Sequence, residues 1–319
     1  MNTVAIRRYR DSDRDIWDSV ASRSVNGTLM HTQAFLSYHP DKRFNRDDRL
    51  IFLRGRPVAV FPLAYKIKDG IKTGQSPYGA SFGGVVGLDL SSLNAELIAE
   101  TLTNTLRENG YGSISLVQAP SCYERDCGNS PVNYFLLKTC DGMLADRGLC
   151  SVVPLRRNRF SQSFRRNVRK GERAGLTFSQ GHDIDGFYPL LRETIEGKHG
   201  SRITHTRNEL NYLVDVLGKR ISIFLAHLRD TPVAGVLTFE DMNCVYAFYN
   251  AHSRSHTDIG ALHALFAHMI DHYREKKEWM DLGLTDRLHI PTNRGLLQFK
   301  EGMGAVNMFR DYFELFLNP

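Results

Sequence analysis

The sequence predicts an α/β fold of two similar domains, each built on a mixed, largely antiparallel twisted sheet. Three observations support this. The chain has 319 residues, more than one typical domain. The order strand, helices, hairpin, strand, helix, strand occurs twice along it. In both halves a hairpin enters its second strand through Pro-Val-Ala, at residues 57–59 and 232–234.

The first domain is expected over residues 1–150. Asp11-Ser12-Asp13 is a helix-capping sequence that follows a first strand. A Gly-rich loop, residues 76–84, precedes a helix whose Leu97, Ile98, Leu102 and Leu106 fall on one face. The elements predicted for this half are strands at 4–8, 50–54, 58–65, 113–118 and 134–138, and helices at 14–21 and 93–109.

The second domain is expected over residues 151–305. Its most periodic segment is 260–277, where Leu262, Leu265, Phe266 and Met269 begin an apolar stripe of helical spacing. We expect residues 306–319, which contain the last strand, to complete the first domain. The predicted elements are helices at 161–174, 187–198, 208–217 and 260–277, and strands at 221–229, 233–240, 244–250 and 309–317.

The composition excludes several classes of protein. Hydrophobic residues make up 42% and charged residues 24%, as in ordinary globular proteins. No run of 18 apolar residues and no leader sequence is present, so we expect a cytoplasmic protein without a transmembrane segment. The five cysteines form no C-x-x-C pair, and His268 and His272 lack the H-E-x-x-H order. We therefore expect reduced thiols and no metal site.

The positive charge is concentrated in one segment. Between residues 156 and 173 eight arginines and lysines face only Glu172, a local charge of +7 in a chain of net charge +6. The remainder of the chain sums to −1, so an anionic partner should bind at this segment. Within it, a basic helix is predicted to place Arg165, Arg166, Arg169 and Lys170 against phosphate groups.

A second informative segment lies near the end of the chain. Asp281-Leu282-Gly283 reads as the end of a strand, and residues 293–305 read as a short helix followed by a Gly-punctuated turn. Lys300 follows the aromatic Phe299 and precedes Gly302-Met303-Gly304. A lysine in such a position could hold an anion or an oxyanion that develops during a reaction.

Four segments, in this order, resemble the FemA/FemB/FemX aminoacyltransferases and their CelD-like relatives in the GNAT superfamily. They are residues 165–176, 232–235, 281–283 and 295–305. The resemblance implies two GNAT-like (acyl-CoA N-acyltransferase-like) domains with an acyl-transfer site in the cleft between them. It also implies that Phe299 packs on the donor and that Lys300 binds donor phosphate and stabilises the tetrahedral intermediate.

Two donors remain open. In FemX-like enzymes the donor is an aminoacyl-tRNA, and in other relatives it is an acyl-CoA. Acetyl-CoA-dependent GNAT enzymes carry an Arg/Gln-x-x-Gly-x-Gly/Ala motif at a helix N-terminus, where backbone N–H groups hold pyrophosphate. Here Arg254, Gly260 and Ala261 occupy that place with a longer spacing. We expect these residues to bind donor phosphate, and no cofactor to be tightly bound.

Candidates for the acceptor site come from loops and from a strand end. Tyr78 lies in the Gly-rich loop, and Tyr249 and Asn250 end an aromatic strand. His199, or else His205, is a candidate proton acceptor in a polar loop. Core packing or a turn role is the alternative for each of these residues.

The function predicted from the sequence is acyl or aminoacyl transfer from an activated donor to an amine. The resemblance implies a small-molecule or envelope-precursor acceptor, that is, a cell-envelope or sugar precursor. One alternative is an acetyl-CoA-dependent N-acetyltransferase. Another is a non-catalytic RNA-binding protein that keeps the fold and the basic helix.

Overall fold

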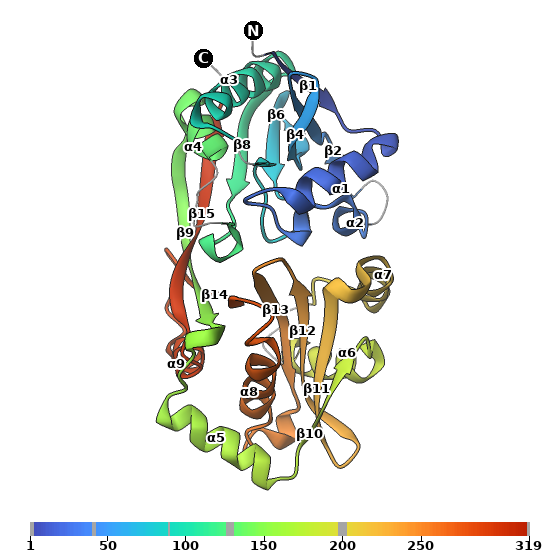
Figure 1. Cartoon of the computed structure of the whole chain (residues 1–319), viewed down its shortest axis with the longest axis vertical. Helices are drawn as coiled ribbons and strands as arrows, with labels where there is room; N and C mark the ends of the chain where they lie inside the picture. The colour runs from blue at the N-terminus through green and yellow to red at the C-terminus, as the bar shows by residue number, and fades with distance from the viewer. Residues whose placement is uncertain (1–2, 40–42, 89, 126–130, 197–202, 318–319) are drawn as a thin grey trace. The chain divides into compact units, whose positions relative to one another are not determined.

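The structure is a computed structural model of the whole chain (Figure 1). It describes residues 3–39, 43–88, 90–125, 131–196 and 203–317. The chain divides into two compact units, Met1–Gly148 with Phe309–Pro319 as unit 1 and Leu149–Met308 as unit 2. Among the described residues, no helix has both the length and the apolar character that a membrane crossing needs.

Unit 1 holds most of the short strands of the chain. Two long strands, β9 (Met143–Pro154) and β15 (Val306–Phe316), cross the boundary between the units along the chain. The other elements of unit 1 are β1 (Val4–Arg8), α1 (Arg14–Arg23), α2 (Gln33–Leu36), β2 (Asn45–Arg46), β3 (Arg49–Leu53), β4 (Arg56–Phe61), β5 (Ala64–Lys68), β6 (Ile71–Ser76), β7 (Val86–Gly87), α3 (Ser92–Glu108), β8 (Tyr111–Val117) and α4 (Pro131–Thr139).

The strands of unit 1 form two hydrogen-bonded groups. One has the order β1-β3-β4-β7 and the other the order β15-β8-β6-β5-β2. Alternate residues of β3 face opposite sides, as the pleat of a strand requires. Leu50 packs in a cluster with Trp17 of α1, whereas Ile51 packs with Ile98 and Leu102 of α3. The four-stranded group is therefore covered on both faces.

Two strand predictions in this unit were wrong. Residues 134–138 lie in the helix α4, which buries Val132 and Leu136 at helical spacing. A short apolar run does not distinguish a strand from a buried helix by its periodicity. The strand predicted over 58–65 is two strands, β4 and β5, which separate at Pro62 and belong to different groups. Proline has no N–H to continue a ladder.

Unit 2 carries the longer strands and the basic helix. Its elements, besides the ends of β9 and β15, are the short 3-10 turns η4 (Leu155–Arg157) and η6 (Arg254–His256), the helices α5 (Gln162–Arg173), α6 (Ile184–Glu196), α7 (Arg207–Leu217), α8 (Ala261–Tyr273) and α9 (Arg294–Gly302), and the strands β10 (Thr177–Gly181), β11 (Ile221–Leu228), β12 (Thr231–Glu240), β13 (Cys244–His252) and β14 (Trp279–Arg287).

The strands of unit 2 follow the order β10-β11-β12-β13-β14, antiparallel except for the pair β13 and β14. Helices cover both faces (Figure 1). Phe224 of β11 joins a core with Phe266 and Met269 of α8. On the other face, a Cβ atom on Gly235 of β12 would lie 2.7 Å from the ring of Phe187 in α6, so α6 packs directly on the strand backbone.

The parallel pair β13 and β14 is short. It joins Cys244 to Trp279, Val245 to Met280 and Tyr246 to Asp281, where the register ends. Gly283, two residues further along β14, has a φ of +74°. Its N–H donates to Oδ1 of Asp281 at 2.7 Å. This left-handed residue turns β14 where the register ends.

Candidate functional site

A pocket lies at the N-terminus of α8 in unit 2. Its volume is about 150 Å³. The end of β13, the segment before α8, the first turn of α8 and Phe299 of α9 form its walls. The residues that line it are His252, His256, Thr257, Gly260, Ala261, Leu262, His263 and Phe299.

Gly260 allows the backbone conformation with which α8 begins. It is the N-cap of the helix, and its φ of +74° lies in the left-handed region that favours glycine. A Cβ atom at this position would lie 2.2 Å from the carbonyl oxygen of Asn167 in α5. Gly171 provides a second close approach, since its Cβ would lie 2.7 Å from the Cβ of Ala264. The two glycines therefore hold the basic helix against the first turns of α8.

We expect Gly260→Ala to disturb this contact more than the left-handed backbone alone would. A non-glycine residue in the left-handed region costs about 1–2 kcal/mol, and an overpacked contact adds about 1–3 kcal/mol. The matched control is Gly175→Ala, because Gly175 has the same φ of +74° and a Cβ there would have no atom within 4 Å. Urea unfolding measures both free energies. Equal losses in the two variants would contradict the α5–α8 contact.

Aromatic rings form one wall of the pocket. The ring of His263 lies 4.9 Å from Phe164 of α5 and 4.9 Å from Phe299 of α9, between centroids. Burial, and then the positive charge of Lys170, lower the pKa of His263. The imidazole is therefore neutral at pH 7. His263 of α8 and Phe299 of α9 thus give the pocket a wall of flat, weakly polar surfaces, and the buried Phe164 of α5 packs against both rings.

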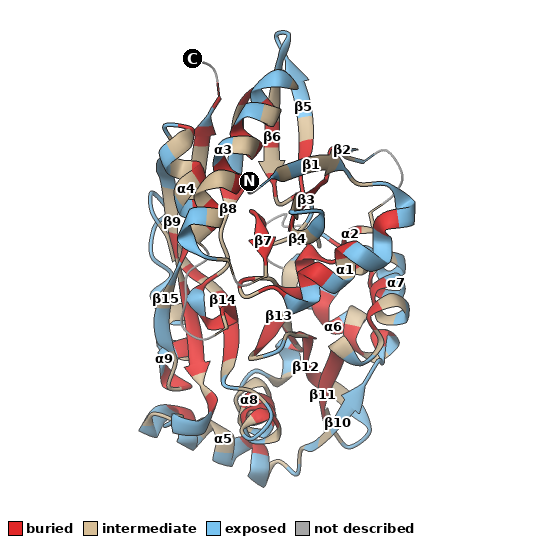
Figure 2. Ribbon diagram, turned by 45° about the horizontal axis from the view of Figure 1, so that its top comes forward, coloured by how far each residue is buried: buried red, intermediate tan, exposed pale blue. Residues whose placement is uncertain are grey.

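The basic side chains of α5 are exposed. Arg165, Arg166, Arg169 and Lys170 all lie on its solvent side, and Figure 2 shows much of this helix in the exposed colour. Ser161 caps the helix by accepting from the N–H of Phe164, and the buried Phe164 anchors it. No ion pair between described residues uses any of the eight cations of residues 156–173. This face therefore presents uncompensated positive charge.

Arg254 does not line the pocket. It is exposed in η6, and its backbone N–H donates to Oε1 of Glu193 in α6 at 2.8 Å. Gly260 and Ala261, which were predicted with it, do line the pocket. Arg254 and Gly260 are further apart in the sequence than the corresponding residues of the acetyltransferase motif. The extra residues form η6 and the turn that follows it. The role of Arg254 in phosphate binding stays a prediction.

Lys300 lies deep in unit 2. Its residue is 3% exposed, and its Nζ donates to the carbonyl oxygens of Gly283 and Leu284 at 2.9 and 3.0 Å and to Oγ1 of Thr285 at 3.0 Å. An ammonium group has three protons, and these three acceptors match them. Successive helix residues point about 100° apart. Phe299 therefore faces the pocket while Lys300 faces β14.

Two of the acceptor candidates lie near the end of β13. The hydroxyl of Tyr249 is 2.7 Å from Nδ1 of His205. Burial, mainly, raises the pKa of Tyr249 to about 12, so the phenol stays protonated at neutral pH. Oδ1 of Asn250 is buried and has no hydrogen-bond partner among the described residues. His199 lies outside the described residues, so its predicted role stays a prediction.

A bulge in β13 sets the direction of these side chains. Leu237 of β12 pairs with Tyr249, but the next residue, Thr238, pairs with Ala247, so Phe248 is the extra residue. Bulges of this kind change the face to which the following side chains point. No signal in the sequence marks the bulge, since the aromatic run 246–249 has no clear alternation.

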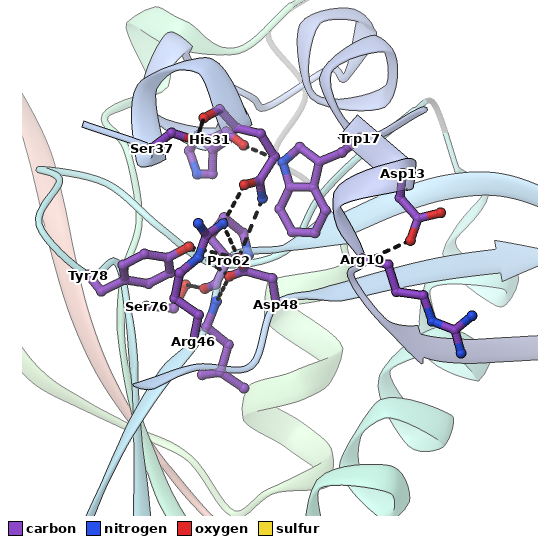
Figure 3. Close-up of polar contacts among 12 residues, drawn as sticks. Arg10, Asp13, Trp17, His31, Ser37, Arg46, Asp48, Pro62, Ser76 and Tyr78 are labelled. Carbon is purple, nitrogen blue, oxygen red and sulfur yellow. Dashed lines mark hydrogen bonds and ion pairs between the residues drawn. The ribbon is translucent and has the colours of Figure 1, made fainter. Parts of the chain in front are cut away.

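The structure corrects the placement of Tyr78. Its side chain is in the core of unit 1 with 0% exposure, and its hydroxyl donates to Oδ2 and Oδ1 of Asp48 at 2.8 and 2.9 Å (Figure 3). Arg46 pairs with Asp48 at 2.7 Å. Burial, and then the Asp48 charge, raise the pKa of Tyr78 well above its usual value. A side chain held in this way has no surface to offer an acceptor.

We expect Tyr78→Phe to affect stability rather than acceptor binding. The change removes the one hydroxyl proton that the two oxygens of the buried Asp48 side chain share. Loss of a donor to a buried group costs about 1–3 kcal/mol, and more for a charged one. Tyr134→Phe is the control, since Tyr134 is 64% exposed. Thermal unfolding should separate the two variants. Weaker acceptor binding by Tyr78→Phe at unchanged stability would instead support the predicted role of Tyr78 in the acceptor site.

Sequence reasoning missed several residues of the pocket. His252, His256 and His263 line it together, although they lie on a strand end, a turn and a helix. Isolated histidines carry no spacing that would mark a common site. The one available signal was the presence of Gly260-Ala261 between them.

Comparisons with known proteins bear on the fold of the chain. Residues 158–290 match the family described as an acetyltransferase (GNAT) domain. No curated protein matches the sequence. Among solved structures, FemX superposes with a TM-score of 0.72 at 14% identity, over 98% of each chain.

Two further structures show the same architecture. L-PGS from Bacillus licheniformis has a TM-score of 0.63 at 14% identity, over 98% of this chain and 94% of that one. A tandem GNAT protein from the clavulanic acid biosynthesis pathway has a TM-score of 0.54 at 10% identity, over 99% of each chain. At these identities the likeness concerns the fold, and it confirms the predicted class of two tandem GNAT-like domains. Residues 158–290 thus match the model of a GNAT acetyltransferase domain, and the chain as a whole has a tandem GNAT-like fold similar to that of FemX.

Proposed function

We propose that this chain transfers an acyl or aminoacyl group from an RNA-linked donor to an amine. The GNAT match and the fold support acyl transfer in general. The observation that carries the choice of donor is the uncompensated positive face of α5, whose helix packs against the first turns of α8 at the pocket. The proposed acceptor is an amine of a cell-envelope or sugar precursor, and the proposed location is the cytoplasm.

The extent of the charge favours RNA over CoA. The cations run from Arg156 through α5 to Arg173, and α5 alone is about 18 Å long at 1.5 Å per residue. CoA carries its phosphates at one end of a small molecule, which a few cations would neutralise. A nucleic-acid backbone presents phosphates at regular intervals, and binding along it rises with each cation that meets one.

The pocket suits the reacting end of such a donor. Backbone N–H groups at a helix N-terminus favour an anion, and the neutral His263 and Phe299 offer faces on which a base or sugar can pack. The amine nitrogen then attacks the ester carbonyl and forms the C–N bond. When the intermediate collapses, the C–O bond breaks and the ribose oxygen leaves with a proton.

The pair of Tyr249 and His205 is the proposed proton carrier. Tyr249 is protonated at neutral pH and can give its proton to the leaving oxygen, while His205 on its hydroxyl can take the proton that the amine loses and pass it to Tyr249. The unpartnered Oδ1 of Asn250 is the proposed acceptor for an amine N–H of the substrate.

We further propose that Lys300 acts by positioning. Its three bonds join α9 to the stretch of β14 that follows the short parallel pair with β13. They fix the helix that presents Phe299 to the pocket. The role that the resemblance implies for Lys300, stabilisation of the oxyanion, requires its Nζ to exchange a present acceptor for the substrate. The two roles predict different effects of Lys300→Met and Thr285→Val on donor binding.

Acetyl-CoA remains the second candidate donor, because the pocket lies at the helix N-terminus where acetyltransferases of this superfamily are expected to bind pyrophosphate. A binding competition separates the two. Fluorescently labelled tRNA is titrated with the protein, and acetyl-CoA is then added. We expect tight, salt-sensitive tRNA binding that millimolar acetyl-CoA does not reverse. Saturable acetyl-CoA binding without tRNA binding would overturn the choice of donor.

A further inference from the structure

A second cavity in unit 2 is not used by the proposed reaction. It lies between η4, at the end of β9, and the start of β14, and its volume is about 140 Å³. That corresponds to about five water molecules at ~30 Å³ each, the size of one planar ring system. Its lining residues are Pro154, Arg156, Arg157, Glu278 and Trp279.

Backbone hydrogen bonds fix the walls of this cavity. The N–H of Leu155 donates to the carbonyl oxygen of Glu278 at 2.9 Å. The N–H groups of Glu278 and Trp279 both donate to the carbonyl oxygen of Asn243, at 2.9 and 3.1 Å. Leu155 itself is fully buried in the core. The backbone at Leu155 and at Glu278–Trp279 is thus held in place. The side chains that line the cavity project from these two fixed segments.

The charged groups of the cavity do not neutralise each other. Arg156, Arg157 and Glu278 are all exposed. Within the described residues, no hydrogen bond or ion pair uses either guanidinium group or the Glu278 carboxylate, although all three line one cavity. Trp279 is half-buried and contributes an indole face. Together these residues offer a flat aromatic surface, a carboxylate that accepts hydrogen bonds, and two guanidinium groups that can bind anions.

We propose that this cavity binds one unpaired nucleotide. The base stacks on the indole of Trp279, its exocyclic amino group donates to Glu278, and a flanking phosphate binds Arg156 or Arg157. Stacking on aromatic side chains is the common way to hold unpaired bases, and a carboxylate accepts from the amino group of cytosine. The inference extends the proposed function, because the basic segment continues from this cavity into α5, but its test needs no transfer reaction.

Intrinsic fluorescence gives a direct readout, because the chain has only two tryptophans. Trp17 is fully buried, and its indole N–H donates to the carbonyl oxygen of His31 at 2.7 Å. Quenching by an added nucleotide therefore reports Trp279. The probes are hexacytidylate and hexauridylate RNA, because cytosine carries an exocyclic amino group where uracil carries a carbonyl. We expect quenching by both, with hexacytidylate bound about 5-fold or more tightly.

Three variants assign the contacts. Trp279→Leu should abolish quenching and weaken binding of a labelled hexacytidylate roughly 5- to 150-fold, the range for loss of one base stack. Glu278→Gln should remove the preference for cytosine over uracil. Arg156→Gln with Arg157→Gln should weaken both RNAs equally and lower the salt dependence. The affinities for CMP and UMP, compared with those for the two RNAs, show whether the site binds free nucleotides or nucleotides within RNA.

The outcomes are distinct. Quenching that is absent, or that persists in Trp279→Leu, overturns the proposal, as does a cytosine preference unchanged in Glu278→Gln. CMP bound as tightly as hexacytidylate would keep the nucleotide site but assign it to free nucleotides. If these results hold while labelled tRNA fails to bind α5, the proposed donor is wrong and the nucleotide site stands.

Discussion

Replacing Lys300 by methionine is expected to lower the free energy of unfolding by about 2–4 kcal/mol. The methionine keeps the length of the side chain but removes the three donors to Gly283, Leu284 and Thr285. Each buried acceptor that loses its partner costs about 1–3 kcal/mol, partly offset because a buried charge is also removed. Urea unfolding measures the loss, and a stability equal to that of the wild type would contradict the positioning role.

Thr285→Val provides the test between the two roles of Lys300. Valine keeps the shape of threonine but removes one of the three acceptors, together with the 2.6 Å hydrogen bond to Ser151. If Lys300 positions α9, both Lys300→Met and Thr285→Val weaken donor binding, because Phe299 shifts in the pocket. If Lys300 instead stabilises the oxyanion, Lys300→Met lowers the transfer rate about 10²–10³-fold at unchanged donor affinity. Thr285→Val then changes little.

Neutralising the basic helix is expected to have the largest effect on donor binding. The variant changes Arg165, Arg166, Arg169 and Lys170 to glutamine, which keeps a good helix propensity. At 50 mM salt the affinity for tRNA should fall by about 10²-fold or more. The slope of log affinity against log salt should fall by about one unit for each phosphate that the helix no longer neutralises. Filter binding over a series of salt concentrations measures both quantities.

The control for this variant removes the same charge from elsewhere in unit 2. It changes four other exposed cations to glutamine, namely Arg192, Arg207, Lys219 and Lys276. We expect its tRNA affinity and salt slope to stay close to those of the wild type. If the two quadruple variants lose affinity equally, binding follows net charge, and α5 is not the binding face.

The sequence was sufficient where the structure depends on local periodicity and composition. The apolar stripe that begins at Leu262 lies on α8, which runs from Ala261 to Tyr273. Asn293 caps α9 by accepting from the N–H of Leu296 at 3.1 Å, as a helix start after a polar loop requires. The cations of 156–173 are exposed without ion pairs between described residues, because the segment holds one anion only. The repeated order of such elements predicted two α/β domains, and the resemblance of four segments to FemX-like proteins implied their GNAT-like class.

The sequence was not sufficient where a side chain finds partners far along the chain. Lys300 was recognised as unusual, but its acceptors lie 15–17 residues earlier, on a strand that bends at Gly283. Tyr78 follows a proline and precedes a glycine, a pattern typical of exposed loops, yet Asp48 holds it in the core across 30 residues. The pocket histidines share a site because the end of β13, η6 and the first turn of α8 meet there, although the three residues have no common spacing in the sequence.

Transfer itself is the most direct test of the account. The protein is incubated with a mixture of tRNAs charged with ¹⁴C-labelled amino acids and with glucosamine or a lysine-containing peptide as the amine. In a parallel reaction acetyl-CoA replaces the charged tRNA, and free thiol is measured. We predict that label moves from tRNA to the amine and that the α5 glutamine variant abolishes this transfer. Thiol release from acetyl-CoA, with the charged tRNA left intact, would contradict the account.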